Sequence, residues 1–252
     1  MARKTYQPKL IVLKTPDEVD TFTAESVMTQ IYQKPDSVLI LPTGNTQIGW
    51  YRLISETYQA GKIDLSKIET FNLDEYYPIK KNHPNSYFFY MKSRFVDKTN
   101  VRPDHWHIPN GEAPTAELAV ENYQKLLCRF QPADLAILGL GPGTTCHIGF
   151  NERGSAADSK TRYVMLNPQT IQTNSLLFPS SNETPKGAIT LGINDILKAK
   201  KIILLAKGEG KAWGVNRTLN GPINSVAPAS FLRLHPDVTF ITDLAAASLL
   251  KS

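Results

Sequence analysis

The sequence contains very little cysteine. Only Cys128 and Cys146 occur among its 252 residues, which is too few for a disulfide framework, and no Cys-x-x-Cys spacing indicates a zinc site. Cys128 directly follows the apolar pair Leu126 and Leu127 in a segment with helical character. We therefore expect Cys128 to be a buried, unreactive thiol.

Long apolar runs are also absent. No stretch approaches the roughly 18 to 20 apolar residues that a membrane-spanning helix needs. The first residues, Met-Ala-Arg-Lys-Thr-Tyr-Gln-Pro, lack the apolar core of a signal peptide. The composition, with 41% hydrophobic and 20% charged residues, excludes collagen-like, low-complexity and disordered chains. These features predict a cytoplasmic globular protein without a membrane partner.

Neither sign of charge dominates. The chain has 28 basic and 23 acidic residues, a formal net charge of +5, which suits nucleic acid, membrane surfaces or phosphorylated metabolites alike. The basic residues are scattered and do not form a stripe with interleaved aromatics, so we expect no nucleic-acid partner. Histidines and carboxylates are not clustered at metal-ligand spacing, and we predict no metal. A homo-oligomer is compatible with the sequence, which carries no signature of oligomeric state.

Short apolar runs alternate with helical stretches along the whole chain, without internal repeats or a long linker. The predicted strands are 37–41, 68–73, 134–140, 201–206 and 238–242, and the predicted helices are 15–33, 46–60, 116–130, 194–199 and 211–219. This alternation is typical of βα units around a largely parallel sheet. The sequence thus predicts one α/β domain over residues 1–252, with ligands at the carboxyl ends of its strands.

Two of these predicted strand ends offer sites for an anion. After the first strand, Thr43, Gly44, Asn45 and Thr46 place a glycine, hydroxyls and an amide at a helix start, where backbone N–H groups favour negative charge. The same residues also make a good helix cap, and this alternative stays open. After the fourth strand, Lys211 follows Gly208 and Gly210 at a helix start, although it could equally be a solvated lysine.

The other two strand ends carry groups that can move protons. Asp74 and Glu75 follow the second strand, and burial there would raise the pKa of a carboxylate that serves as a base, although Asp74 could also cap or pair locally. His147 lies in a glycine-rich loop after the third strand, and Glu152 could orient its ring. Together the four strand ends indicate proton transfer on a small phosphorylated molecule.

A series of motifs makes the chain resemble a known family. The motifs are Leu41-Pro42-Thr43-Gly44, Thr70-Phe71-Asn72-Leu73-Asp74-Glu75-Tyr76, His83-Pro84-Asn85-Ser86-Tyr87, His147-Ile148-Gly149-Phe150-Asn151-Glu152 and Leu234-His235-Pro236. In order and spacing they are similar to those of the glucosamine-6-phosphate deaminases, also called isomerases. Further runs, such as Ile189-Thr190-Leu191-Gly192 and Pro228-Ala229-Ser230-Phe231-Leu232, look more like the galactosamine-6-phosphate branch.

The resemblance implies a three-layer α/β/α, Rossmann-like fold and a reaction without cofactors. The sugar ring opens, the aldose becomes a ketose, and ammonia leaves. By the same resemblance Asp74 is the base that moves a proton between C2 and C1, His147 the acid–base group for ring opening, and Glu152 its carboxylate partner. The resemblance places Gly44, Asn45 and Lys211 around the phosphate, and we predict that Thr43 and Thr46 bind the substrate beside them.

Two departures from the family pattern stand out. The loop before His147, Gly141-Pro142-Gly143-Thr144-Thr145-Cys146, is two residues longer than usual. Thr145 is then nearest to the usual ring-opening Asp or Asn, and its hydroxyl cannot carry negative charge at neutral pH. Where the glucosamine enzymes often have a phosphate-binding arginine, this chain has Leu176 and Leu177. Lys211 would then be the main cation, or Arg153 or Arg162 would substitute.

Two other functions compete with a deaminase. A 6-phosphogluconolactonase is similar in fold and in its glycine-loop histidine, but it would show Asp-Glu-Arg in place of Asp74-Glu75-Tyr76 and a Ser-Leu-Phe-Pro-like run after the histidine. A non-catalytic sugar-phosphate sensor would not need Asp74, His147 and Glu152 together. Only the longer loop before His147 favours a sensor.

Overall fold

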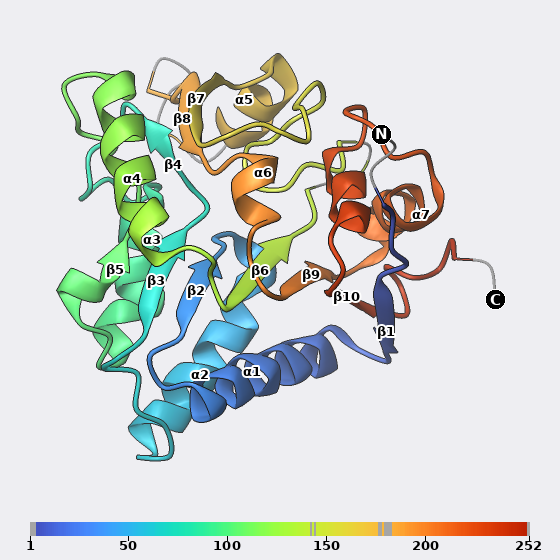
Figure 1. Cartoon of the computed structure of the whole chain (residues 1–252), viewed down its shortest axis with the longest axis horizontal. Coiled ribbons are helices and arrows are strands. Elements are labelled where there is room, and N and C mark those ends of the chain that lie inside the picture. Colours follow the sequence, from blue (N-terminus) through green and yellow to red (C-terminus); the bar gives the residue numbers. More distant parts are fainter. Residues whose placement is uncertain (1–3, 142, 144, 176–177, 179–182, 251–252) are drawn as a thin grey trace.

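The computed structural model describes residues 4–141, 143, 145–175, 178 and 183–250. A seven-stranded sheet in the order β1-β10-β9-β6-β2-β3-β5 forms its centre, and every neighbouring pair is parallel (Figure 1). The strands are β1 (Lys9–Leu13), β2 (Val38–Leu41), β3 (Glu69–Asn72), β5 (Trp106–His107), β6 (Leu135–Gly139), β9 (Ile202–Ala206) and β10 (Val238–Asp243).

The inner strands are apolar on both faces. β2 reads Val-Leu-Ile-Leu and β9 reads Ile-Ile-Leu-Leu-Ala, and every residue of both strands is buried. Parallel strands that are covered on both sides have this composition. The edge strand β1 differs, because Leu10 and Val12 remain exposed on it.

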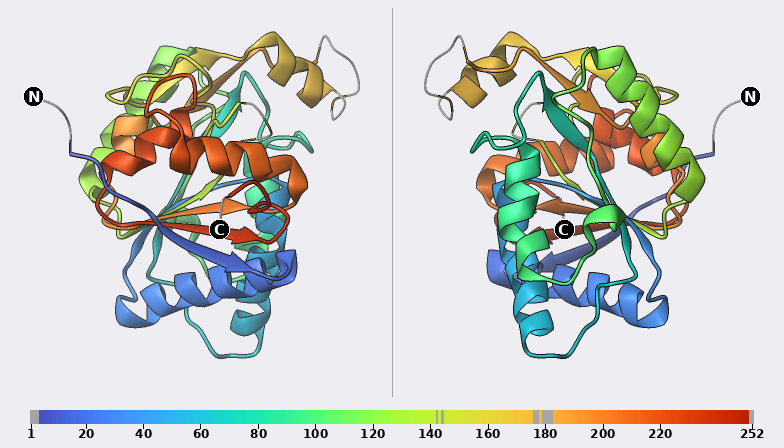
Figure 2. Two further views of the ribbon diagram at one scale, coloured as in Figure 1. Left: turned by 90° about the vertical axis from the view of Figure 1, so that its right-hand side faces the viewer. Right: turned by 90° about the vertical axis from the view of Figure 1, so that its left-hand side faces the viewer.

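Helices cover both faces of the sheet (Figure 2). On one face α1 (Pro16–Gln33), α2 (Ile48–Gln59) and α3 (Tyr87–Arg94) form an apolar cluster with the strands. On the other face α4 (Ala116–Phe130), α6 (Ile193–Ile196) and α7 (Ala212–Asn220) form a second cluster. In β2, Leu39 belongs to the first cluster and Ile40 to the second, as the alternation of a strand requires. The molecule therefore has three layers.

Side chains in the sequence set several helix starts. Thr15, Ser86 and Thr115 precede α1, α3 and α4, and each accepts a hydrogen bond from the backbone N–H three residues further on. Such caps satisfy an N–H group that has no partner within the helix. Short 3₁₀ segments complete the description: Asn45–Gln47, Val96–Lys98, Pro103–His105, Glu209–Lys211 and Pro228–Leu234.

A smaller antiparallel sheet lies beyond the carboxyl ends of the large one (Figure 1). Its strands, in the order β4-β8-β7, are β4 (Asp74–Tyr77), β8 (Gly187–Thr190) and β7 (Arg162–Met165), and α5 (Pro168–Ser175) follows β7 in the chain. Only Leu73 separates β3 from β4. The small sheet therefore begins directly at the end of a central strand.

The three-layer fold and the largely parallel sheet of the sequence prediction are confirmed. The five predicted strands are β2, β3, β6, β9 and β10, and the five predicted helices overlap α1, α2, α4, α6 and α7. The prediction for Cys128 was wrong, because this residue is exposed. Helix α4 buries Ala119, Tyr123 and Leu127, and the residue after Leu127 points away from that face. Among the described helices, none has the length and apolarity to cross a bilayer.

Candidate active site

A cavity of about 210 Å³ lies at the carboxyl ends of β2 and β6. It brings together three of the four predicted strand ends, because Thr43, Gly44 and Thr46, Asp74, and His147 all line it. A larger hollow of about 500 Å³ lies between α1 and the starts of β9 and β10, and it contains none of the predicted site residues. The smaller cavity is therefore the candidate active site.

The loop after β2 forms one wall of the cavity. Gly44 has φ of +102°, a conformation that favours glycine. Two tyrosines from the helices α2 and α3 hold this loop in place. The Tyr51 hydroxyl donates to the Pro42 carbonyl and the Tyr90 hydroxyl donates to the Gly44 carbonyl, both at 2.8 Å. Asn45 does not line the cavity and begins the 3₁₀ turn that leads into α2.

Asp74 contributes a buried carboxyl group to the cavity. It is the first residue of β4, opposite Thr190 of β8, and does not lie in a loop after a strand. Burial, together with the negative charge of Glu75, raises the pKa of Asp74 to about 8. A carboxyl group in this range can both take up and release a proton near neutral pH.

Glu75 joins β4 to the start of α3. Its carboxylate accepts hydrogen bonds from the backbone N–H groups of Tyr76, Tyr87 and Phe88 at 2.7 to 2.9 Å. Burial raises the pKa of Glu75 to about 7, against these three hydrogen bonds, which lower it. The same contacts bring Tyr87 to the cavity wall. The sequence analysis did not find α3, although Ser86, its N-cap, was part of a quoted motif.

His147 reaches the cavity from a tightly bent loop. Cys146 just before it has φ of +44°, which is unusual for a residue with a side chain. A Cβ atom on Gly141 would lie 2.5 Å from the imidazole ring, so only glycine leaves room there. The Thr145 hydroxyl lies 2.9 Å from Nδ1 of His147. Burial, with the positive charge of Lys211, lowers the pKa of His147 to about 4, and the ring is neutral at pH 7.

Lys211 lies beside the cavity and does not line it. Its Nζ donates a 2.6 Å hydrogen bond to the carbonyl of Leu140, a residue of the cavity wall. Burial lowers the pKa of Lys211 to about 8, so the ammonium remains the main form at neutral pH. A positive charge thus lies within reach of both His147 and the end of β6.

Glu152 is placed elsewhere. Its carboxylate accepts hydrogen bonds from the backbone N–H of Asn167 and the hydroxyl of Thr170, at the start of α5. The contacts of the described residues do not join it to His147, and its role as the partner of that ring remains a prediction. It lines a separate surface hollow together with Arg153 and Arg162.

The two arginines considered as phosphate ligands therefore do not reach the candidate active site. Arg162 donates to the Asn151 side chain and to the Ser155 hydroxyl, both at 2.9 Å. Two parts of the sequence prediction lie outside the described residues. They are Leu176 and Leu177, which stand where the family often has an arginine, and positions 142 and 144 of the longer loop. Within the described part of the chain, no group of three His, Cys, Asp or Glu residues could hold a metal ion.

The other four histidines, His83, His105, His107 and His235, do not line this cavity. His107 forms a 2.8 Å contact with Glu69, and His105 lies 3.6 Å from the same carboxylate. Among the lining residues, Tyr87 belongs to a motif of the sequence analysis but was given no role there, and Gln47 was not singled out. Gln47 directly follows Thr46, and only its place at the start of the predicted helix 46–60 could have drawn attention to it.

The comparisons with known proteins agree on one family. A family model described as glucosamine-6-phosphate isomerases/6-phosphogluconolactonase matches residues 15–240. A glucosamine-6-phosphate deaminase of Halothermothrix orenii is 43% identical over 242 residues, which are 96% of this chain and 100% of the relative. One of Clostridium botulinum (strain Hall) is 43% identical over 243 residues, 96% of this chain and 99% of the relative.

Solved structures give the same result. A structure described as a monomeric glucosamine-6-phosphate deaminase superposes with a TM-score of 0.91 at 41% identity, covering 96% of this chain and 99% of that one. A 6-phosphogluconolactonase from Trypanosoma brucei superposes with a TM-score of 0.77 at 22% identity, covering 98% of this chain and 100% of that one. At the lower identity the likeness shows a shared fold alone.

Proposed function

Because this chain belongs to the family of glucosamine-6-phosphate isomerases and 6-phosphogluconolactonases, we propose that it is an amino-sugar 6-phosphate deaminase. It converts glucosamine 6-phosphate or galactosamine 6-phosphate, with one water molecule, to a ketohexose 6-phosphate and ammonia. The observation that carries the proposal is Asp74, a buried carboxyl group whose pKa is raised to about 8 and which lines one cavity with His147.

The reaction begins with opening of the sugar ring. His147, neutral because burial lowers its pKa to about 4, accepts the proton of the anomeric hydroxyl, and a proton returns to the ring oxygen. Thr145 fixes the ring through the contact at Nδ1. The open aldose then exposes C2 to the carboxylate of Asp74.

Asp74 next moves one proton. Its ionised form removes the proton from C2 and returns it to C1, while a second proton passes from the amino group to the aldehyde oxygen. The aldehyde thereby becomes an alcohol and the amine-bearing carbon becomes an imine. Water adds to this imine and ammonia leaves, so that C2 becomes a ketone. A buried base suits this step, and only 6% of Asp74 is exposed.

The phosphate group lies at the loop after β2. Thr43, Gly44 and Thr46 line the cavity at the end of that strand, where α2 and its preceding turn begin, and backbone N–H groups at a helix start favour an anion. Asn45 contributes through the backbone of the same turn. Lys211 supplies the positive charge, at the cost of its hydrogen bond to Leu140.

Whether the preferred substrate is galactosamine 6-phosphate or glucosamine 6-phosphate is a question for a direct assay. Runs such as Ile189-Thr190-Leu191-Gly192 favour galactosamine 6-phosphate, whereas the curated relatives act, by their names, on glucosamine 6-phosphate. The two sugars differ only at C4. Ammonia release is measured with both sugars side by side, and the larger kcat/KM identifies the substrate.

The same assay separates the competing functions. Acid release from 6-phosphogluconolactone without ammonia would instead indicate a lactonase. A hexosamine 6-phosphate that raises the melting temperature without any turnover would indicate a sensor. Ammonia release that disappears in Asp74→Asn supports the deaminase.

We further infer that one chain suffices for catalysis in the cytoplasm. The inference is supported by a solved structure with a TM-score of 0.91, which is described as that of a monomeric deaminase. Sedimentation velocity at the concentration of the assay tests the monomer.

A further inference from the structure

Gln47 is a buried amide at the wall of the candidate active site. It ends the 3₁₀ turn Asn45–Gln47 and immediately precedes α2. Only 1% of the residue is exposed, yet it lines the cavity that also contains Thr43, Asp74 and His147. A polar side chain in such a place needs a partner for each of its hydrogen-bonding groups.

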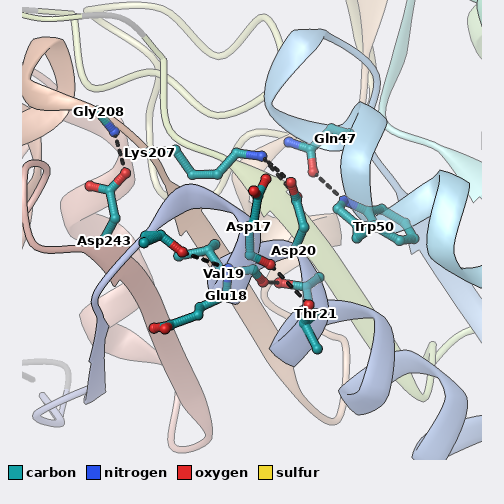
Figure 3. Close-up of polar contacts among 12 residues, drawn as sticks. Asp17, Glu18, Val19, Asp20, Thr21, Gln47, Trp50, Lys207, Gly208 and Asp243 are labelled. Carbon is teal, nitrogen blue, oxygen red and sulfur yellow. Dashed lines mark hydrogen bonds and ion pairs between the residues drawn. The ribbon is translucent and has the colours of Figure 1, made fainter.

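The orientation of this amide is fixed by Trp50. Nε1 of Trp50 lies 2.7 Å from Oε1 of Gln47, and an indole nitrogen can only donate a hydrogen bond. The amide oxygen must therefore face Trp50, and the amide nitrogen Nε2 points the opposite way. Figure 3 shows the oxygen directed at Trp50 and the nitrogen on the side of Lys207.

The amide nitrogen has two hydrogens and no acceptor among the described residues. The nearby Asp20 carboxylate is engaged by Lys207, whose Nζ lies 2.8 Å from both of its oxygens (Figure 3). That ion pair is nearly buried, with 14% and 9% of the two side chains exposed. Nε2 is not among the fully buried side-chain atoms that lack a partner, so it retains access to the cavity that Gln47 lines, where a ligand can supply the acceptor.

Gly139 provides the space for this amide. A Cβ atom built on Gly139 would lie 2.7 Å from Nε2 of Gln47. Gly139 is the last residue of β6, and it lines the same cavity. Because Gly139 has no side chain, the end of β6 leaves room for Nε2 of Gln47 at the cavity wall.

We propose that Nε2 of Gln47 donates a hydrogen bond to a phosphate oxygen of the substrate and is a substrate-binding residue of this enzyme. The proposal rests on the proposed function, in which the phosphate lies at the adjoining loop. Gln47 directly follows Thr46 and stands at the start of α2, a helix of twelve residues, where the backbone also favours negative charge. Gln47 is the neutral donor in this set and Lys211 the cationic one.

Two variants test the proposal. Gln47→Leu removes the donor, and Gln47→Glu keeps an oxygen for Trp50 but replaces the donor with a negative charge. We expect KM for the amino-sugar phosphate to rise about tenfold in Gln47→Leu, because a hydrogen bond to a charged group is lost, and more in Gln47→Glu. The wild-type enzyme would make this hydrogen bond to the phosphate equally in the ground state and in the transition state. Its loss should therefore change kcat little.

Inorganic phosphate gives a second measurement that does not need turnover. Millimolar phosphate should raise the melting temperature of the wild-type protein and raise it less in both variants. Gln30→Leu is the matched control, since Gln30 is also an amide in a hydrogen bond, to Ser37 at 3.1 Å, but does not line this cavity. It should retain both the KM and the phosphate-induced shift.

The possible results separate the two proposals. An unchanged KM in both Gln47 variants overturns the inference, as does a raised KM with an intact phosphate-induced shift, which would place the contact at the sugar. If the wild-type protein releases no ammonia, the proposed function fails. The phosphate-induced shift then still decides whether Gln47 binds this anion.

Discussion

The ionisable residues around the cavity are all shifted toward their neutral forms. Burial raises the pKa of Asp74 to about 8 and lowers the pKa of His147 to about 4 and that of Lys211 to about 8. At neutral pH the carboxyl group is therefore largely protonated, the imidazole is neutral and the ammonium keeps its charge. The site is weakly positive before a phosphate dianion binds.

Replacing Asp74 should separate binding from chemistry. Asp74→Asn keeps the size of the side chain but removes the base, so ammonia release should fall at least a thousandfold while KM changes little. Full activity of this variant would contradict the proposed mechanism.

The same variant should also be more stable than the wild-type protein. The raised pKa means that the wild-type protein loses stability as the pH rises from about 4, where Asp74 ionises in the unfolded chain, to about 8, where it ionises in the folded one. Asparagine does not titrate. Urea unfolding at pH 5 and pH 8 should show a difference of a few kcal/mol that grows with pH.

Glu75 should set the pH at which the enzyme becomes active. Its negative charge raises the pKa of Asp74, so Glu75→Gln should let Asp74 ionise at lower pH. The acidic limb of kcat/KM against pH should then move toward lower pH. Phe88→Ala, on the same helix start, leaves the carboxylate in place and should leave the limb where it is.

At the scale of elements, two carboxylates each bind the start of a helix. Glu75 of β4 binds the start of α3, and Glu152 binds the start of α5. Negative charge at a helix start is favourable because the first N–H groups have no partner within the helix. The position of each helix therefore depends on a residue from another part of the chain.

Glu152 offers a test of this dependence. Glu152→Gln weakens the contact with Asn167 and Thr170, and we expect α5 to exchange its amide hydrogens about tenfold faster, as a loss of roughly 1.4 kcal/mol implies. Thr170→Val removes one of the same contacts and should act in the same direction. If Glu152→Gln lowers kcat while Thr170→Val does not, the carboxylate acts through His147 as the family resemblance implies.

Most of the elements predicted from the sequence are uniformly apolar or follow one helical face, although β3, which reads Glu-Thr-Phe-Asn, was also predicted. The inner strands β2, β6 and β9 belong to the first kind, and α1 and α4 to the second. By contrast, β4 reads Asp-Glu-Tyr-Tyr and β7 reads Arg-Tyr-Val-Met, so neither has a strong strand pattern. Pairing with β8 decides their structure, and local sequence does not contain that information.

The candidate site was predictable for a similar reason. Asp74 and His147 follow recognisable strands, so reading the strand ends found both. The partner of Glu152 depends on α5, and the orientation of Gln47 depends on Trp50 and on the missing side chain of Gly139. Such contacts arise from packing between distant segments and have no motif of their own.

At the scale of the whole molecule, one sheet separates two apolar layers that share every inner strand. Leu39 packs into one layer and Ile40 into the other. Neither layer can therefore unfold without disrupting the strands against which the other layer packs. We expect urea to unfold the protein in a single transition. Far-ultraviolet circular dichroism and tryptophan fluorescence should give coincident curves, and two separated midpoints would contradict a single domain.

The order of the strands also has a consequence for synthesis. The edge strand β1 pairs only with β10, so that Lys9 lies opposite Thr239. While the ribosome is still adding residues, β1 has no neighbour, and its exposed Leu10 and Val12 face the surroundings of the nascent chain. Among the described strands, the first along the chain is thus the last to be joined to the sheet.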